Sequence, residues 1–78
     1  MTEGKVQAKR IKELEAEGYY VIKLLKTNKN GIPDLIAIKP DDVLFSEVKT
    51  LKGKLSALQE YRLKELDGLG FKTEVYKG

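Results

Sequence analysis

The chain contains no cysteine and no histidine. Without cysteine it can form neither disulfides nor thiolate metal sites. Without histidine it cannot form a Ser-His-Asp triad, a His-containing zinc site or the active site of a histidine-dependent nuclease. Any metal ion must therefore be held by oxygen ligands, which suit Mg²⁺ and Mn²⁺.

Long apolar runs, internal repeats, linkers and a signal-peptide pattern are also absent, so we expect a soluble intracellular, cytoplasmic protein without membrane spans. Its 78 residues predict a single domain over 1–78 with a thin core, since so short a chain buries only about 60% of its unfolded surface. Such chains often gain stability from a metal or a second subunit, and we expect a homodimer. The net charge of +3 is compatible with a nucleic-acid partner but does not require one.

The hydrophobic patterns and turn residues predict six elements in the order α-β-β-β-α-β. These are a helix over 3–17, strands over 19–26, 34–39 and 43–49, a helix from Ser56 to Gly68, and a strand over 71–76. Tight turns make the first three strands antiparallel, and the β-α-β crossover makes the last pair parallel and right-handed. The expected fold class is α/β, with one mixed four-stranded sheet and a helix on each face.

Both helices show start and stop residues and an apolar side. Thr2 is a suitable N-cap and Gly18 a suitable stop for the first helix, in which Val6, Ile11 and Leu14 form a stripe. Glu3, Gln7 and Arg10 fall within that stripe, which predicts that Glu3 points inward. In the second helix, Ser56 and Gln59 have capping-box spacing. Its expected apolar side carries Leu58, Tyr61, Leu66 and Leu69.

Two acids and a lysine on neighbouring predicted strands form the most informative pattern. Glu47 and Lys49 share one side of their strand, roughly 6.6 Å apart at ~3.3 Å per residue. Asp34 opens the adjacent strand and can reach the same side. The two carboxylates and the Val48 carbonyl would offer a hard cation three oxygens, and Lys49 could orient water or stabilise developing charge.

These residues belong to a set of short motifs, Gly31-Ile32-Pro33-Asp34-Leu35, Glu47-Val48-Lys49, Lys52-Gly53-Lys54-Leu55-Ser56 and Gln59. Together the motifs resemble the PD-(D/E)XK nuclease superfamily and, within it, the VRR-NUC family, which is similar in fold to Holliday-junction resolvases. The resemblance covers nearly the whole chain and implies a restriction-endonuclease-like core. It also implies a Mg²⁺- or Mn²⁺-dependent endodeoxyribonuclease, dimeric and selective for branched DNA such as four-way junctions.

The resemblance also assigns roles to individual residues. It places Asp34, Glu47 and Lys49 in the catalytic and metal site, Glu3 beside them, and Gln59 in support. Two features depart from the pattern that the resemblance implies: Ser46 stands where an aliphatic core residue is usual, and we expect no appended specificity domain.

Each site residue also has a purely structural interpretation. Asp34 could cap a turn, and Glu47 and Lys49 could form a surface pair of small energy. Glu3 could complement the helix dipole, and Gln59 could serve only the capping box.

The candidate nucleic-acid contacts are basic and aromatic side chains. The lysines expected near the site, as phosphate contacts, are Lys23, Lys26, Lys29, Lys52 and Lys54. Tyr19 and Tyr20 could stack on bases, but adjacent strand tyrosines are usually one core and one surface residue.

Two other functions fit the same sequence. The fold could be a non-catalytic nucleic-acid-binding module with a residual metal site, or a stabilised scaffold that retains the nuclease motif.

Overall fold

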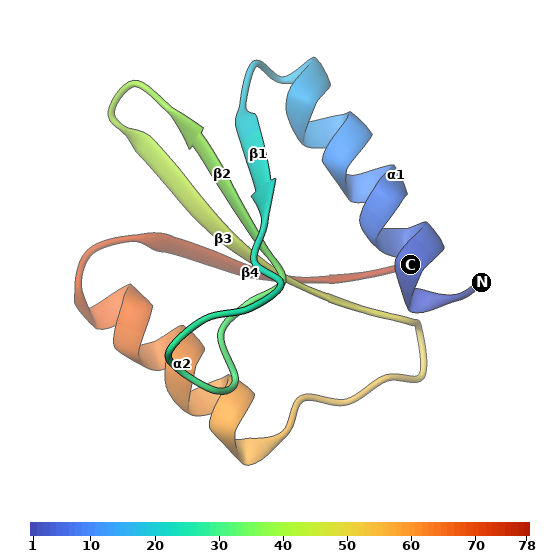
Figure 1. The fold of residues 1–78 in the computed structure, drawn as a ribbon, viewed down its shortest axis with the longest axis vertical. Coiled ribbons are helices and arrows are strands. Elements are labelled where there is room, and N and C mark those ends of the chain that lie inside the picture. Colours follow the sequence, from blue (N-terminus) through green and yellow to red (C-terminus); the bar gives the residue numbers. More distant parts are fainter.

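The computed structural model describes residues 1–78 and contains all six elements in the expected order (Figure 1). They are α1 (Glu3–Ala16), β1 (Tyr20–Lys23), β2 (Leu35–Lys39), β3 (Asp42–Lys49), α2 (Ala57–Gly68) and β4 (Lys72–Lys77). The strands form one sheet in the order β1-β2-β3-β4, antiparallel except for the parallel β3–β4 pair. The α/β architecture predicted from the sequence is therefore confirmed.

Helix α1 covers one face of the sheet, here called the α1 face, and builds the core. The Thr2 side chain accepts a hydrogen bond from the Lys5 N–H, and Gly18 ends the helical region at φ +93°. The buried apolar residues are Val6, Leu14, Tyr19, Leu35, Ala37, Leu44 and Val48. Every one of them lies on α1, in the link that follows it, or on the strand positions of the α1 face.

Helix α2 lies on the opposite face, here called the α2 face, and covers only part of it (Figure 1). It packs mainly against β4, and none of its residues is fully buried. The predicted apolar side of this helix is therefore largely wrong. Leu58, Tyr61 and Leu69 are 41%, 57% and 69% exposed, because the helix lies at the β4 side of the sheet.

Strand β1 ends at Lys23, so the prediction of a strand over 19–26 was too long. The Leu24 N–H still donates to the Asp34 carbonyl at 2.8 Å. Beyond that bond the chain leaves the sheet in a loop that runs to Pro33. Tyr19 is buried and Tyr20 is 72% exposed, which is the core-and-surface pair expected from alternation along a strand. No helix is long and apolar enough to cross a membrane.

Candidate active site and metal centre

The strand register brings Asp34 and Glu47 together on the α2 face. Leu35 pairs with Ser46 in the antiparallel β2–β3 ladder, so one step further Asp34 lies opposite Glu47. Side chains alternate along a strand, and Lys49 therefore emerges on the same side as Glu47. The three side chains that the sequence pattern singled out are thus neighbours in space.

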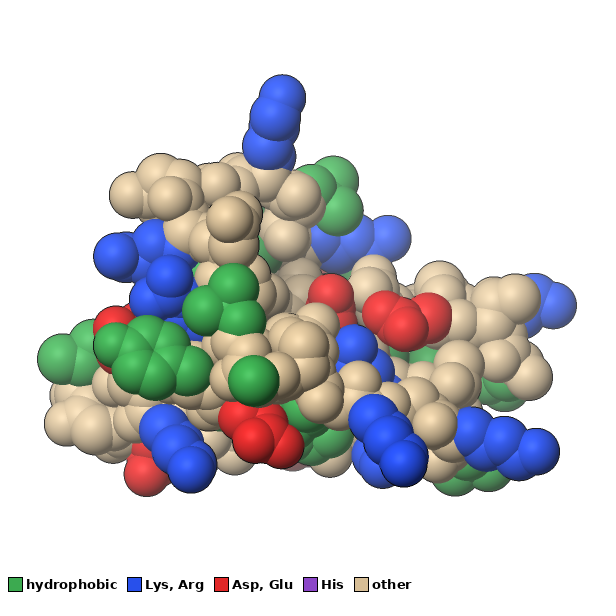
Figure 2. All heavy atoms as spheres, turned by 90° about the horizontal axis from the view of Figure 1, so that it is seen from below, with side chains coloured by type: hydrophobic (Ala, Val, Ile, Leu, Met, Phe, Trp, Pro, Cys, Tyr) green, Lys and Arg blue, Asp and Glu red, His purple; other side chains and the backbone are tan.

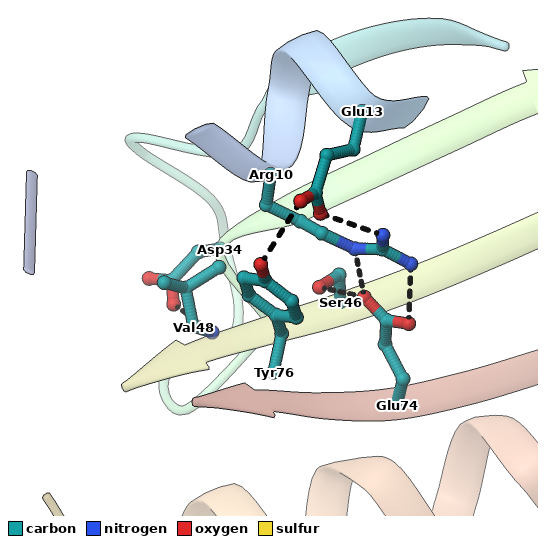
Figure 3. A network of polar contacts seen from close by, with 7 residues as sticks. All are labelled: Arg10, Glu13, Asp34, Ser46, Val48, Glu74 and Tyr76. Atoms are coloured by element: carbon teal, nitrogen blue, oxygen red, sulfur yellow. Dashed lines mark hydrogen bonds and ion pairs between the residues drawn. The ribbon is translucent and has the colours of Figure 1, made fainter. Parts of the chain in front are cut away.

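Pro33 leaves the Val48 backbone free to take part in this site. Continuing the register would place Pro33 opposite Val48, but proline has no N–H to donate to the Val48 carbonyl. The Val48 N–H donates instead to Asp34 Oδ2 at 2.8 Å (Figure 3). Because both backbone groups of a strand residue point to the same neighbour, the Val48 carbonyl also faces the Asp34 side.

Glu47 is the least solvated charged group of the site. The residue is 1% exposed, and its Oε1 atom is buried without a hydrogen-bond partner. Burial and, after it, the charge of the nearby Asp34 raise the pKa of Glu47 to about 8, against the opposing charge of Lys49. When two acids are held together in a buried site, one of them commonly has a raised pKa. A cation between them would neutralise their repulsion and satisfy the orphaned oxygen.

Lys49 and Gln59 both approach the other oxygen of Glu47. Lys49 Nζ lies 3.6 Å from Glu47 Oε2, and its side chain is 12% exposed. Gln59 Nε2 donates to the same oxygen at 3.3 Å. Gln59 also completes the capping box, because its Oε1 accepts from the Ser56 N–H at 2.9 Å. The capping and supporting placements of Gln59 therefore coexist.

Glu3 does not point into the core, contrary to the expectation from its position on the apolar stripe. It is exposed, in the first turn of α1, before the first buried helix residue Val6. Its charge still contributes, as the weakest of the named causes, to the raised pKa of Glu47. No three acidic side chains lie close enough together to hold a metal ion. Glu3 is thus a neighbour of the Asp34–Glu47 pair, not a member of it.

The five lysines proposed for nucleic-acid contact are all exposed. Lys26 and Lys29 line one hollow in the loop that joins β1 to β2, whereas Lys52 and Lys54 line two different hollows. Lys23 ends β1 on the α1 face, away from the side of Glu47. Figure 2 shows basic side chains spread around the rim of one face, with acidic and basic groups close together near its middle.

A polar network on the α1 face explains the unusual Ser46 (Figure 3). Ser46 is fully buried and its hydroxyl donates to Glu74 Oε2 at 2.6 Å. Arg10 Nε and Nη2 each donate to Glu74 at 2.8 Å, and the guanidinium lies 4.8 Å from the Tyr76 ring centroid. The network was not predicted from the sequence, although the charged Arg10 on the apolar stripe was a signal for it. The serine supplies a hydrogen bond that an aliphatic residue could not.

The sheet order, the paired acids and the adjacent lysine define the class of protein: a PD-(D/E)XK nuclease core. The VRR-NUC domain family model matches residues 2–78. A solved structure of a VRR-NUC domain is similar to the chain with 31% identity and a TM-score of 0.82, covering 97% of this chain and 83% of that one.

A second structural match is to Hjc, a Holliday junction resolvase from Archaeoglobus fulgidus, with a TM-score of 0.74. It shares 24% identity and covers 95% of this chain, which spans 66% of the resolvase, so this likeness concerns the fold alone. No curated protein matches the chain in sequence. The chain belongs to the VRR-NUC family, a nuclease family whose superfamily generally uses divalent metals.

Proposed function

We propose that the protein is a Mg²⁺- or Mn²⁺-dependent endodeoxyribonuclease that hydrolyses phosphodiester bonds in branched DNA, such as four-way junctions. The observation that carries the proposal is the buried Glu47 Oε1 without a partner, beside the Asp34 carboxylate. A lone unsatisfied carboxylate oxygen is costly in a protein interior and calls for a compensating charge. A bound divalent cation supplies that charge.

The residues of the site divide the work between binding and chemistry. Asp34, Glu47 and the Val48 carbonyl would hold the cation, which when bound lowers the pKa of a water and neutralises phosphate charge. Lys49, held 3.6 Å from Glu47 Oε2, would orient the attacking water or stabilise charge that develops on the phosphate. Gln59 would keep the Glu47 carboxylate in one orientation, and Glu3 would hold metal-bound water from the rim.

The DNA substrate is supported by the family and by the charge of the surface. Hjc, whose structure is similar to that of this chain, is a Holliday junction resolvase, and the chain shares its fold. Exposed lysines would neutralise DNA phosphates. Those assigned to this role are Lys26, Lys29, Lys52 and Lys54, whereas Lys23 lies on the α1 face, away from Glu47.

Cleavage assays test the enzyme proposal directly. Plasmid DNA and a labelled four-way junction are incubated with the protein in Mg²⁺, in Mn²⁺ or in EDTA. We expect metal-dependent cleavage that Glu47→Gln and Lys49→Ala each abolish, whereas Glu15→Gln and Lys64→Ala, which remove exposed helix charges, retain it. DNA binding without cleavage in either metal would contradict the enzyme proposal and favour a non-catalytic binding module. High stability without any DNA affinity would favour a scaffold.

The proposal includes a homodimer, which the uncovered part of the α2 face supports. Seven strand positions of this face are apolar, and none of these seven side chains is fully buried. They are Tyr20, Ile22, Ile36, Ile38, Val43, Phe45 and Val75. The solvent-accessible area is 5251 Å², whereas a folded monomer of 8.8 kDa is expected to expose roughly 4,800 Å². A second copy on this face would complete the apolar layer that α2 leaves open.

Sedimentation of matched variants tests the dimer. Ile22 is 42% exposed on the uncovered face, and Leu51 is 73% exposed in the loop after β3. We expect Ile22→Lys to shift the protein to monomer, because it buries an unpaired charge in the interface, and Leu51→Lys to leave the dimer unchanged. A wild-type chain that sediments as a monomer would refute the homodimer while leaving the nuclease proposal standing.

A further inference from the structure

The connection between β1 and β2 is longer than a hairpin needs. Residues 24–34 join these strands, whereas Pro40 and Asp41 suffice to join β2 to β3. Hairpin loops usually have 2–5 residues, and longer ones that persist in compact domains are commonly functional. We call residues 24–32 the 24–32 loop; it leads directly into Pro33 and Asp34.

Helix α2 holds this loop by a hydrogen bond and by close packing. Arg62 Nε donates to the Asn30 carbonyl at 2.9 Å, and the Arg62 side chain is only 17% exposed. Gly31 lies against Leu58 so closely that a Cβ at position 31 would lie 2.7 Å from Leu58 Cγ. Gly31 also has φ +77°, a conformation that favours glycine. The loop is therefore pinned at two adjacent residues.

One turn of α2 thus serves both the loop and the acidic pair. Leu58 and Arg62 contact the loop, and Gln59 between them donates to Glu47. Lys26 and Lys29 are exposed on the pinned loop and line its hollow of about 290 Å³. Two cations on a fixed loop lose less freedom when they bind phosphate than cations on a mobile one.

We propose that Arg62 is a positioning residue that fixes the 24–32 loop so that Lys26 and Lys29 bind backbone phosphates of the nucleic-acid strand entering the site. The inference rests on the proposed function for its substrate class. Arg62 itself pairs with Glu65 at 3.0 Å and with the loop carbonyl. It acts through the loop and touches neither Asp34 nor Glu47.

Binding measurements in EDTA test this role without requiring activity. Fluorescence anisotropy gives the affinity of the wild type, Lys29→Gln, Arg62→Met and the double variant for a labelled duplex and a four-way junction. Removing one phosphate contact should weaken binding roughly eightfold at 0.1 M salt and lower the salt slope by about 0.9. In the Arg62→Met background, Lys29→Gln should weaken DNA binding by less than about twofold, because the lysine is no longer held in place. Glu65→Gln, which keeps the Asn30 bond, is the matched control and should behave as wild type.

A second pair of variants tests the packing contact. Gly31→Ala should speed amide hydrogen exchange in the 24–32 loop and weaken DNA binding. Leu58→Ala added to Gly31→Ala should restore part of both, because it removes the atom that the new Cβ would meet. Metal affinity of Arg62→Met should stay at the wild-type value, since the Asp34–Glu47 pair is unchanged.

The outcomes separate this inference from the proposed function. A wild-type protein that binds neither the duplex nor the four-way junction would overturn both the positioning role and the proposed function. A wild type that binds DNA, with the Lys29→Gln loss identical in the two backgrounds and loop exchange unchanged in Arg62→Met, would overturn the positioning role alone.

Discussion

Replacing Glu47 with glutamine should stabilise the metal-free protein at neutral pH. The side chain is buried beside Asp34, and its pKa is raised to about 8 from an ordinary 4.5. An acid whose pKa is raised by folding stabilises the fold most below its unfolded pKa, and that contribution is lost as the pH rises from 4.5 to 8. Glutamine at position 47 has no charge to bury, and its amide can still accept a hydrogen bond from Gln59 and donate one to Asp34.

The magnitude follows from the width of the pH interval. At pH 7 the folded state has lost about 3 kcal/mol of stability, because it keeps Glu47 protonated while the unfolded state ionises it, and each unit of pKa displacement is worth about 1.4 kcal/mol. Urea unfolding in EDTA should therefore show Glu47→Gln more stable than the wild type by about 3 kcal/mol at pH 7 and nearly equal to it at pH 4.5. For a domain of this size the gain corresponds to roughly 10–20 °C in Tm.

Metal should remove most of this difference in stability between the two proteins. At a Mg²⁺ or Mn²⁺ concentration 100 times its Kd, a bound cation adds about 2.7 kcal/mol to the wild type, and Glu47→Gln should gain almost nothing. The affinity of the wild type should rise with pH as Glu47 loses its proton. Glu15→Gln should change stability by less than about 0.5 kcal/mol at either pH. If the stabilities of the wild type and Glu47→Gln depend equally on pH in EDTA, the account of a destabilising buried acid is refuted.

Three further outcomes can be measured with the same unfolding assay and with DNA cleavage. Ser56→Ala removes only the helix cap, so it should lower the free energy of unfolding by about 1 kcal/mol and leave DNA cleavage intact. Gln59→Leu should lower both stability and cleavage. Equal cleavage by the two variants would refute a supporting role for Gln59. Arg10→Met should lower the free energy of unfolding by about 2–3 kcal/mol, because it leaves the Glu74 carboxylate, which is 25% exposed, without its ion pair. An unchanged stability would show that water already solvates that carboxylate. Ser46→Val, which restores an aliphatic residue, should cost about 1 kcal/mol through the lost hydrogen bond; a gain in stability would show that packing outweighs that bond.

The polar network on the α1 face shows how the structure accommodates a serine at position 46, where the resemblance to the family predicts an aliphatic residue. Ser46 and Glu47 are adjacent on β3 but point to opposite faces. Ser46 joins the Arg10–Glu74 pair under α1, while Glu47 faces Lys49 and Gln59. Serine at this position, where the resemblance to the family predicts an aliphatic residue, therefore affects the core without contacting the acidic pair.

The amino-acid sequence by itself determined the element order, the caps at Thr2 and Ser56, and the spacing that put Asp34, Glu47 and Lys49 on one side of adjacent strands. These features depend on local periodicity and turn chemistry, which act over a few residues. The tertiary structure alone decided that β1 stops at Lys23 and that Glu3 remains exposed. Those outcomes depend on which residues of distant segments meet.

The same division holds for the two helices. The capping box of α2 follows from four consecutive residues, and the structure contains it. The sequence could not show that α2 would cover only the β4 side of the sheet, or that Arg62 would reach the Asn30 carbonyl across 32 positions. Such contacts arise from the packing angle of a whole helix on a twisted sheet, and no short segment of the chain carries that information.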